Sequence, residues 1–297
     1  MPAFAQSLPL YSFAPAKINL SLHVCGRRSD GYHDIESLVA FASEGDGLTL
    51  VQGEALALEI TGPFAFDLQA TDDNLIFKAV KALQKYKSNL RLGTFHLEKR
   101  LPVSSGIGGG STDAAAALRL IAQINNIPFS DPDLIRAASE TGADVPVCLE
   151  TQARIMRGIG DHLEAPVQLP RISVLLINPG ISVSTPAVFS ALGLEKGQQY
   201  RSADAMQLPV VIKTQEQLIS LLMQTENDLQ APAISQCPKI AKVLNALEAL
   251  SGCEFARMSG SGATVFGIFD NFDHAESAAA SVSAQHPHWW AKPAWLK

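Results

Sequence analysis

Apolar positions recur along this chain with two different periods. In residues 16–24, AKINLSLHV, every second side chain is apolar, which predicts a strand with one buried face. The same alternation predicts further strands in residues 48–62, with a turn near Gly53, and in residues 94–102, where Pro102 ends the strand.

Six other segments have the three- and four-residue spacing of apolar positions that is typical of helices. They are residues 73–86, 111–126, 132–142, 214–229, 237–252 and 271–285. We expect Asp72 or Asp73 to cap the first of these helices. Ser111 or Thr112 is expected to cap the second, and Asp113 then lies in its first turn, where the helix dipole favours an acid.

The remaining segments complete an α+β arrangement. Residues 171–180 form a continuous apolar run that predicts a buried strand, and residues 255–269 predict a strand, a small-residue turn and a second strand. Residues 143–166 have the pattern of short strands and turns, whereas residues 193–211 predict a loop or mobile insert. Strands alternate with helices in both halves, so we expect two domains with a boundary between residues 155 and 172.

Length and composition agree with two folded domains, residues 1–160 and 161–297. The chain has 297 residues, of which 47% are hydrophobic and 18% charged, a balance that suits a folded protein. Its net charge of −6 argues against a general nucleic-acid binder. No stretch is apolar and long enough to span a bilayer, and the N-terminal residues lack the features of a secretory signal.

The spacing of the cysteines and the composition of the C-terminal tail predict the redox compartment and the partners of the protein. None of the four cysteines has metal-ligand spacing, which predicts buried free thiols in a reducing cytoplasm and no metal site built by the protein. The aromatic tail at residues 286–296 is expected to dock on the body of the protein or on a neighbouring chain. We expect a monomer or a weak homodimer that binds a small molecule, with no nucleic-acid or membrane partner.

The segment LPVSSGIGGGSTDAAAALRL, residues 101–120, holds four glycines within five positions. It follows a predicted strand and opens a predicted helix, so its backbone can approach an anion closely while free N–H groups point toward that anion. Three interpretations compete: a tight packing turn, a dinucleotide loop, and a nucleotide phosphate loop. The dinucleotide motif lacks its third glycine, and the Walker-type motif lacks its lysine.

This loop resembles the phosphate loop of the galactokinase, homoserine kinase, mevalonate kinase and phosphomevalonate kinase (GHMP) superfamily. The triple glycine, followed by a hydroxyl residue and then alanines, resembles the 4-diphosphocytidyl-2-C-methyl-D-erythritol kinase branch in particular. Four further motifs resemble the same branch and lie in the same order along nearly the whole chain. They are residues 14–39 with DGYHD, 141–149 with GADVP, 226–234 with ENDLQ, and 256–269 with SGSGAT.

The resemblance implies a two-domain GHMP-kinase fold: an N-terminal ribosomal-protein-S5-domain-2-like ATP domain, a C-terminal ferredoxin-like α/β sandwich, and the active site in the cleft between them. It also implies an ATP-dependent, Mg²⁺-assisted transfer of phosphate to the 2-hydroxyl of the cytidylyl-linked methylerythritol. The route is the non-mevalonate synthesis of isoprenoid precursors.

The resemblance also assigns residues to ATP. Those expected to cradle its phosphates are Pro102, Val103, Ser104, Ser105, Gly106, Ile107, Gly108, Gly109, Gly110, Ser111 and Thr112. A hydroxyl of Ser111 or Thr112 is expected to contact phosphate or Mg²⁺. Lys99 and Asn74 are placed near the adenosine part, although Lys99 also has the pattern of an ordinary exposed strand lysine.

On the acceptor side, the resemblance makes Asp144 the catalytic acid and Lys17 its ion-pair partner. From spacing alone, Asp144 also fits a turn or helix cap, and Lys17 fits a solvated position on a strand. The residues expected to bind the acceptor are Asn19 near the substrate, Tyr32 and His33 at the base, Phe189 as an opposing aromatic wall, and Thr185 at the polyol end.

The turn at residues 259–264 is expected to close the site beside the glycine loop, with a plain hairpin as the alternative. Three other functions stay open: a related small-molecule kinase of homoserine or mevalonate type, a nucleotide sensor without turnover, and a dinucleotide oxidoreductase.

Overall fold

The long strand β3 (His33–Gly53) takes part in both of the units into which this chain folds. The computed structural model describes residues 8–201, 209 and 211–297. The first unit contains the chain up to Ala16 together with Gly45–Val103 and Gly109–Glu150. The second contains Lys17–Glu44, Ser104–Gly108 and Thr151–Lys297. The last crossing between the units lies between Glu150 and Thr151, and two earlier segments, Lys17–Glu44 and Ser104–Gly108, also belong with the C-terminal part.

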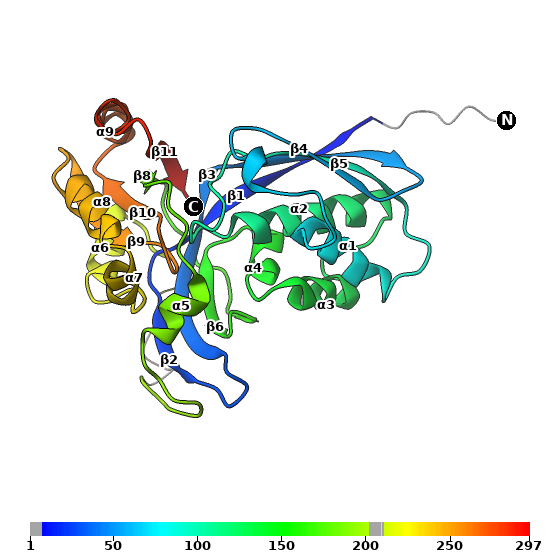
Figure 1. Cartoon of the computed structure of the whole chain (residues 1–297), viewed down its shortest axis with the longest axis horizontal. Coiled ribbons are helices and arrows are strands. Elements are labelled where there is room, and N and C mark those ends of the chain that lie inside the picture. The colour runs from blue at the N-terminus through cyan, green and yellow to red at the C-terminus, as the bar shows by residue number, and fades with distance from the viewer. Residues whose placement is uncertain (1–7, 202–208, 210) are drawn as a thin grey trace. The chain divides into compact units, whose positions relative to one another are not determined.

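In the first unit, a small sheet is covered by helices. The C-terminal part of β3 pairs antiparallel with β5 (Leu92–Glu98), and β5 pairs parallel with β4 (Ala57–Thr61). The helices are η1 (Ala65–Asp67), α1 (Leu75–Gln84), α2 (Gly109–Ile124), α3 (Pro132–Thr141) and α4 (Val145–Glu150). Figure 1 shows α1 to α4 together on one side of β4 and β5.

Helix α2 lies at the centre of this helical layer because its side chains are small. Its four consecutive alanines, residues 114–117, are all fully buried. A helix that is buried on every side needs such residues, since they let neighbouring backbones approach closely. The alanine run that follows the glycine loop is therefore the packing core of the first unit.

The second unit contains a larger antiparallel sheet. The N-terminal part of β3 pairs with β2 (His23–Arg27) and β6 (Arg154–Gly158), and β6 pairs with β7 (His162–Leu163). Strand β11 (Trp290–Leu296) lies between β3 and β8 (Ile172–Asn178). Strands β10 (Val265–Phe269) and β9 (Cys253–Met258) follow β8. The helices are α5 (Thr185–Ser190), α6 (Gln215–Leu222), α7 (Gln230–Gln236), α8 (Lys239–Glu248) and α9 (Phe272–Gln285).

The strand expected at residues 16–24 is two strands, β1 (Leu10–Asn19) and β2, and both of its faces are buried. Its apolar positions are covered as expected. Its polar positions are also at most 5% exposed, which contradicts the expected solvated face; they are Lys17, Asn19, Ser21 and His23. Charged and polar groups are buried only where other groups contact them, so this polar face marks a place where the chain builds a site.

Several local expectations were wrong. Asn74 caps α1 instead of Asp72 or Asp73, because its side chain accepts a hydrogen bond from Ile76 N. Helix α2 begins at Gly109, so Ser111 and Thr112 lie inside its first turn and do not cap it. Other helices stand where none was expected; they are α4, α5 and α7.

The segment at residues 193–211 is a loop where it is described. Its residues 202–208 and 210 lie outside the described part, and the others form neither a helix nor a named strand. Among the helices of the described residues, none combines the length and the apolar character that a membrane crossing requires.

The aromatic tail docks on the body of the protein, as expected. As strand β11, it is hydrogen-bonded to β8 over its whole length, from Trp290 to Leu296. The Trp295 ring stacks on Phe272 at 4.7 Å between centroids, and the guanidinium of Arg171 lies over the Trp295 ring. The tail is therefore an internal part of the second unit's sheet.

A matched pair of phenylalanines tests the core of the first unit. Phe95 in β5 is fully buried, whereas Phe66 in η1 is 82% exposed. Phe95→Ala should lower the free energy of unfolding by about 3–5 kcal/mol, because it leaves a cavity in a close-packed core. Phe66→Ala should change it by less than about 0.5 kcal/mol. Urea denaturation measures both, and equal effects would contradict the assignment of this core.

Candidate functional site

The glycine loop of residues 104–108 packs on the end of β1, where Lys17 lies. The Lys17 N–H donates to Ile107 O at 2.9 Å. A Cβ on Gly108, whose φ is +64°, would lie 3.2 Å from the Lys17 side chain, so only glycine lets the loop rest on that aliphatic stem. Lys17 is 3% exposed, and the interpretation of it as a solvated strand lysine is therefore wrong.

The turn at residues 259–262 meets the glycine loop backbone to backbone. A Cβ on Gly106, whose φ is +75°, would lie 2.6 Å from the carbonyl oxygens of both Ser259 and Gly262. The Ser259 hydroxyl donates to Gly106 O and accepts from the Asn19 N–H, each at 3.0 Å. The expectation that this turn lies beside the loop is confirmed, and Ser259 is a linking residue that sequence reasoning did not single out.

Asn19 has a fixed orientation within this block. Its Nδ2 donates to the Ser37 hydroxyl at 2.7 Å, and that hydroxyl donates to Ser21 O. The side chain is 3% exposed. Loop, turn and strand thus form one hydrogen-bonded block that holds Lys17 and Asn19.

The predicted base-binding residues lie together in part. The rings of His33 and Phe189 stack with centroids 4.8 Å apart, so Phe189 contacts His33 directly. Tyr32 is 62% exposed. Burial and the charge of Arg27 lower the pKa of His33, and its Nε2 is buried without a hydrogen-bond partner among the described residues. The Thr185 hydroxyl lies 2.7 Å from that of Ser261 in the turn.

The rest of the glycine segment lies in the first unit, at the start of α2. A Cβ on Gly109 would lie 3.1 Å from Lys99 Nζ. The Thr112 hydroxyl donates to Gly109 O at 2.9 Å and the residue is fully buried, so this hydroxyl serves the helix itself. Gly110 is exposed and Ser111 half-buried. Of the two residues before the loop, Pro102 is buried and Val103 is half-buried.

Lys99 is buried between two carboxylates and is 2% exposed. Its Nζ lies 2.5 Å from Asp46 and 2.7 Å from Asp113. The exposed-strand interpretation of Lys99 is therefore wrong. The expectation that Asp113 lies in the first turn of its helix is also wrong, because α2 begins at Gly109 and its first turn holds no acid. Asp46, whose Oδ1 also accepts from the N–H groups of Arg100 and Leu101, carried no signal in the sequence.

One ammonium thus serves two buried acids. Asp113 Oδ1 has no hydrogen-bond partner among the described residues, while both oxygens of Asp46 accept hydrogen bonds. Burial therefore raises the pKa of Asp113 to about 7, although Lys99 opposes the shift. The carboxylates raise the pKa of Lys99 in spite of its burial, so it stays charged.

The remaining predicted residues occupy local structural positions. Asp144 directly precedes α4 and is half-buried. It lies in the first unit and Lys17 in the second, so their pairing stays a prediction. Ser104 is exposed with a left-handed φ of +51°, and Ser105, 4% exposed, accepts from the Thr264 N–H through its carbonyl. In the described part of the chain, no three His, Cys, Asp or Glu side chains gather as a metal site.

Comparisons with known proteins agree with this arrangement. Residues 74–152 match the GHMP kinases N terminal domain, and residues 211–288 match the GHMP kinases C terminal domain. A 4-diphosphocytidyl-2-C-methyl-D-erythritol kinase of Methylorubrum extorquens is 50% identical over 283 residues, which cover 94% of this chain and 96% of that protein.

Two solved structures are similar over nearly all of the chain. A crystal structure of 4-(cytidine 5'-diphospho)-2C-methyl-D-erythritol kinase has a TM-score of 0.75 and 32% identity, covering 97% of this chain and 99% of that one. The homoserine kinase of Cytophaga hutchinsonii, at 16% identity, has a TM-score of 0.65 over 98% of this chain and 95% of that one, which shows a common fold alone. The α+β GHMP-kinase fold expected from the sequence is confirmed.

The raised pKa of Asp113 predicts a pH dependence of stability. Folded Asp113 keeps its proton up to a pH of about 7, whereas the unfolded chain releases it near the ordinary value of 3.8. The free energy of unfolding should therefore fall as pH rises through this window, and Asp113→Asn, which cannot ionise, should escape that fall. Relative to the parent, the variant should gain about 4 kcal/mol between acidic and neutral pH.

Urea denaturation of parent and variant at a series of pH values measures this difference. Asp67→Asn, at an exposed acid of the same unit, serves as the control and should show no such trend. A difference between Asp113→Asn and the parent that does not change with pH would contradict the assignment.

Proposed function

The chain belongs to the family of 4-diphosphocytidyl-2-C-methyl-D-erythritol kinases, and from this premise we propose how it transfers the γ-phosphate of ATP to the 2-hydroxyl of its acceptor. The products are the 2-phosphate and ADP, on the non-mevalonate route to isoprenoid precursors. The observation that carries the proposal is the block in which Ser259 joins the glycine loop at Gly106 to the strand at Asn19. Phosphoryl transfer depends mainly on such positioning.

The phosphates of ATP bind at the start of α2. The first N–H groups of this 16-residue helix have no partner within the helix, and its dipole favours an anion there. This explains how a loop without a lysine holds a triphosphate. When bound, Mg²⁺ neutralises charge on the phosphates. The half-buried Ser111 fits a contact to it, whereas the Thr112 hydroxyl is already bonded to Gly109 O.

Lys17 and Asp144 act on the acceptor hydroxyl. Asp144 accepts its proton or orients it for in-line attack, and Lys17 stabilises the negative charge that develops. Three observations support this role of Lys17. The residue is buried, Gly108 packs against its aliphatic stem, and its backbone N–H donates to Ile107 O. A charge held this way loses little orientational freedom during the reaction.

The cytosine base of the acceptor binds at Tyr32 and His33. The exposed ring of Tyr32 offers a stacking surface, and the neutral imidazole of His33 offers a buried Nε2 that lacks a partner among the described residues. The Phe189 ring stacks on the His33 ring, so we assign Phe189 the role of orienting His33. This role replaces that of a second aromatic wall facing the cytosine base. Thr185, bonded to Ser261, lies at the polyol end.

All four cysteines are free thiols, in keeping with action in the cytoplasm.

Replacing Asp144 tests the chemistry. With ATP, Mg²⁺ and the cytidylyl acceptor, Asp144→Ala should lower kcat by a factor of about 10² to 10⁴, which is the usual contribution of a positioned acid–base group. Asp67→Ala, at an exposed acid of the same unit, should keep the parent's kcat. The measurement is ADP release, with circular dichroism to establish that both variants fold. An Asp144→Ala variant as active as the parent would remove Asp144 from the mechanism.

The same assay tests the choice of acceptor. The parent protein should release ADP with 4-diphosphocytidyl-2-C-methyl-D-erythritol and not with homoserine or mevalonate. ATP binding without turnover on any acceptor would instead favour a nucleotide sensor, and binding of NAD would favour an oxidoreductase.

Replacing His33 tests base recognition. His33→Ala should raise KM for the cytidylyl acceptor by a factor of about 10 to 100, because it removes a hydrogen bond at a buried position and leaves the base polar group unpaired. KM for ATP should stay close to that of the parent. His162→Ala, at an exposed histidine of the same unit, is the matched control. An unchanged acceptor KM in His33→Ala would place the base elsewhere.

A further inference from the structure

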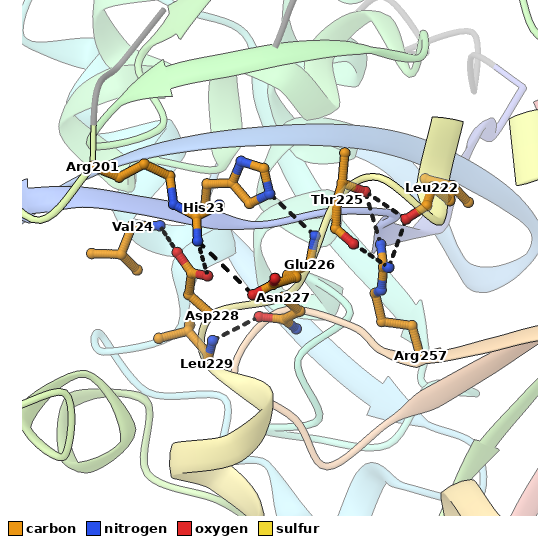
Figure 2. Close-up of polar contacts among 10 residues, drawn as sticks. All are labelled: His23, Val24, Arg201, Leu222, Thr225, Glu226, Asn227, Asp228, Leu229 and Arg257. Carbon is orange, nitrogen blue, oxygen red and sulfur yellow. Dashed lines mark hydrogen bonds and ion pairs between the residues drawn. The ribbon is translucent and has the colours of Figure 1, made fainter. Parts of the chain in front are cut away.

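A segment of the second unit, residues 222–229, connects α6 to α7 and lies against β2 (Figure 2). The Leu22 N–H donates to Glu226 O at 2.9 Å, and the Asp228 N–H donates to Leu22 O at 2.8 Å. The Val24 N–H donates to the Asp228 carboxylate at 2.7 Å, which Arg201 also contacts. These bonds attach one side of the segment to the strand that follows Asn19.

Arg257 anchors the same segment from β9. Its guanidinium donates to Leu222 O at 2.8 Å and to Thr225 O at 2.6 Å (Figure 2). It also donates to Leu20 O at 2.9 Å. The segment is therefore held at both ends by groups that do not contact the 259–262 turn. Removing a contact between the segment and that turn should leave the segment itself in place.

Asn227 makes that contact. Its Nδ2 donates to Met258 O and to Gly260 O, each at 2.8 Å, and its Oδ1 accepts from the Leu229 N–H at 3.0 Å. The residue is 7% exposed. Both hydrogens of its amide are thus used, and they hold the two carbonyls that flank Ser259 in the chain. A carboxylate at this position would have no hydrogens to donate.

Ser259 is also the residue that joins the glycine loop to the acceptor strand, through Gly106 O and the Asn19 N–H. The chain of contacts runs from Asn227 to the carbonyls around Ser259, from Ser259 to Gly106, and from Ser259 to Asn19. Every member of this chain lies in the second unit.

We propose that Asn227 is a positioning residue of the kinase reaction: it holds the turn so that Ser259 keeps the glycine loop and Asn19 at a fixed distance. The proposal rests on the proposed function. Asn227 itself touches neither substrate, and its effect passes through Ser259. A displacement of about 1 Å between reacting groups is enough to slow a reaction about a hundredfold while substrates still bind.

The test compares two neighbouring substitutions by steady-state kinetics with ATP, Mg²⁺ and the cytidylyl acceptor. Asn227→Asp keeps the shape and the bond to Leu229 N but cannot donate to the turn. It should lower kcat about a hundredfold and leave both KM values within a few fold. Asp228→Asn is the matched control, because the Asp228 side chain is 4% exposed in the same segment and its contacts are with Val24 and Arg201. Asp228→Asn should keep the parent's kcat, even if its melting temperature falls as far as that of Asn227→Asp.

A double-mutant cycle tests the route through Ser259. Ser259→Ala removes the hydroxyl that joins Gly106 to Asn19 and should lower kcat without a matching change in KM. Combined with Asn227→Asp, it should lower kcat no further than the more damaging of the two alone, because both changes break one chain of contacts. If Asn227→Asp does not fold, Asn227→Ala takes its place in the cycle.

The outcomes separate the two proposals. A parent protein that releases no ADP with the cytidylyl acceptor overturns the proposed function and this inference with it. If the parent is active, two results would overturn the positioning role alone. Asn227→Asp could have the same kcat as Asp228→Asn, or the effects of Asn227→Asp and Ser259→Ala on kcat could multiply in the double variant. Loss confined to kcat, with no further loss in the double variant, supports it.

Discussion

The arrangement of the second unit's site depends on the close approach of two backbones at Gly106. A side chain there would collide with the carbonyl oxygens of Ser259 and Gly262 at 2.6 Å, and the loop would have to move away. With that approach, one serine hydroxyl reaches Gly106 on one side and Asn19 on the other. The backbone of the glycine loop and the end of β1 are thereby held together by a contact that only a glycine permits.

A second constraint supports the start of α2 in the first unit. Lys99 lies under Gly109 and balances Asp113, which projects from the same helix, and Asp46, which projects from the middle of β3. A buried ion group of this kind contributes little to stability compared with an apolar core, because burying the charges costs nearly what their attraction returns. Its effect is on geometry, because the Lys99 ammonium holds the start of α2 at a fixed position against β3.

Sequence patterns predicted the elements well where one rule governs them. The alternating strands, the alanine helix and the final helix follow from local period and composition, and the ordered motifs led to the family. The patterns failed where burial is decided by distant parts of the chain. Lys17 and Lys99 both read as solvated strand lysines, and only the fold shows a glycine loop over one and two acids around the other. Asp46 and Asn227 form their contacts with residues more than thirty positions away, which no local pattern encodes.

The position of β11 has a consequence for how the second unit's sheet forms. Residues 290–296 are an interior strand, with β3 on one side and β8 on the other. Their partners in β8 lie more than a hundred positions earlier in the chain, so this pairing closes a long loop and is slow compared with the formation of helices. Until β11 is in place, the edge of β8 that it covers has no partner and can pair with a strand of another chain.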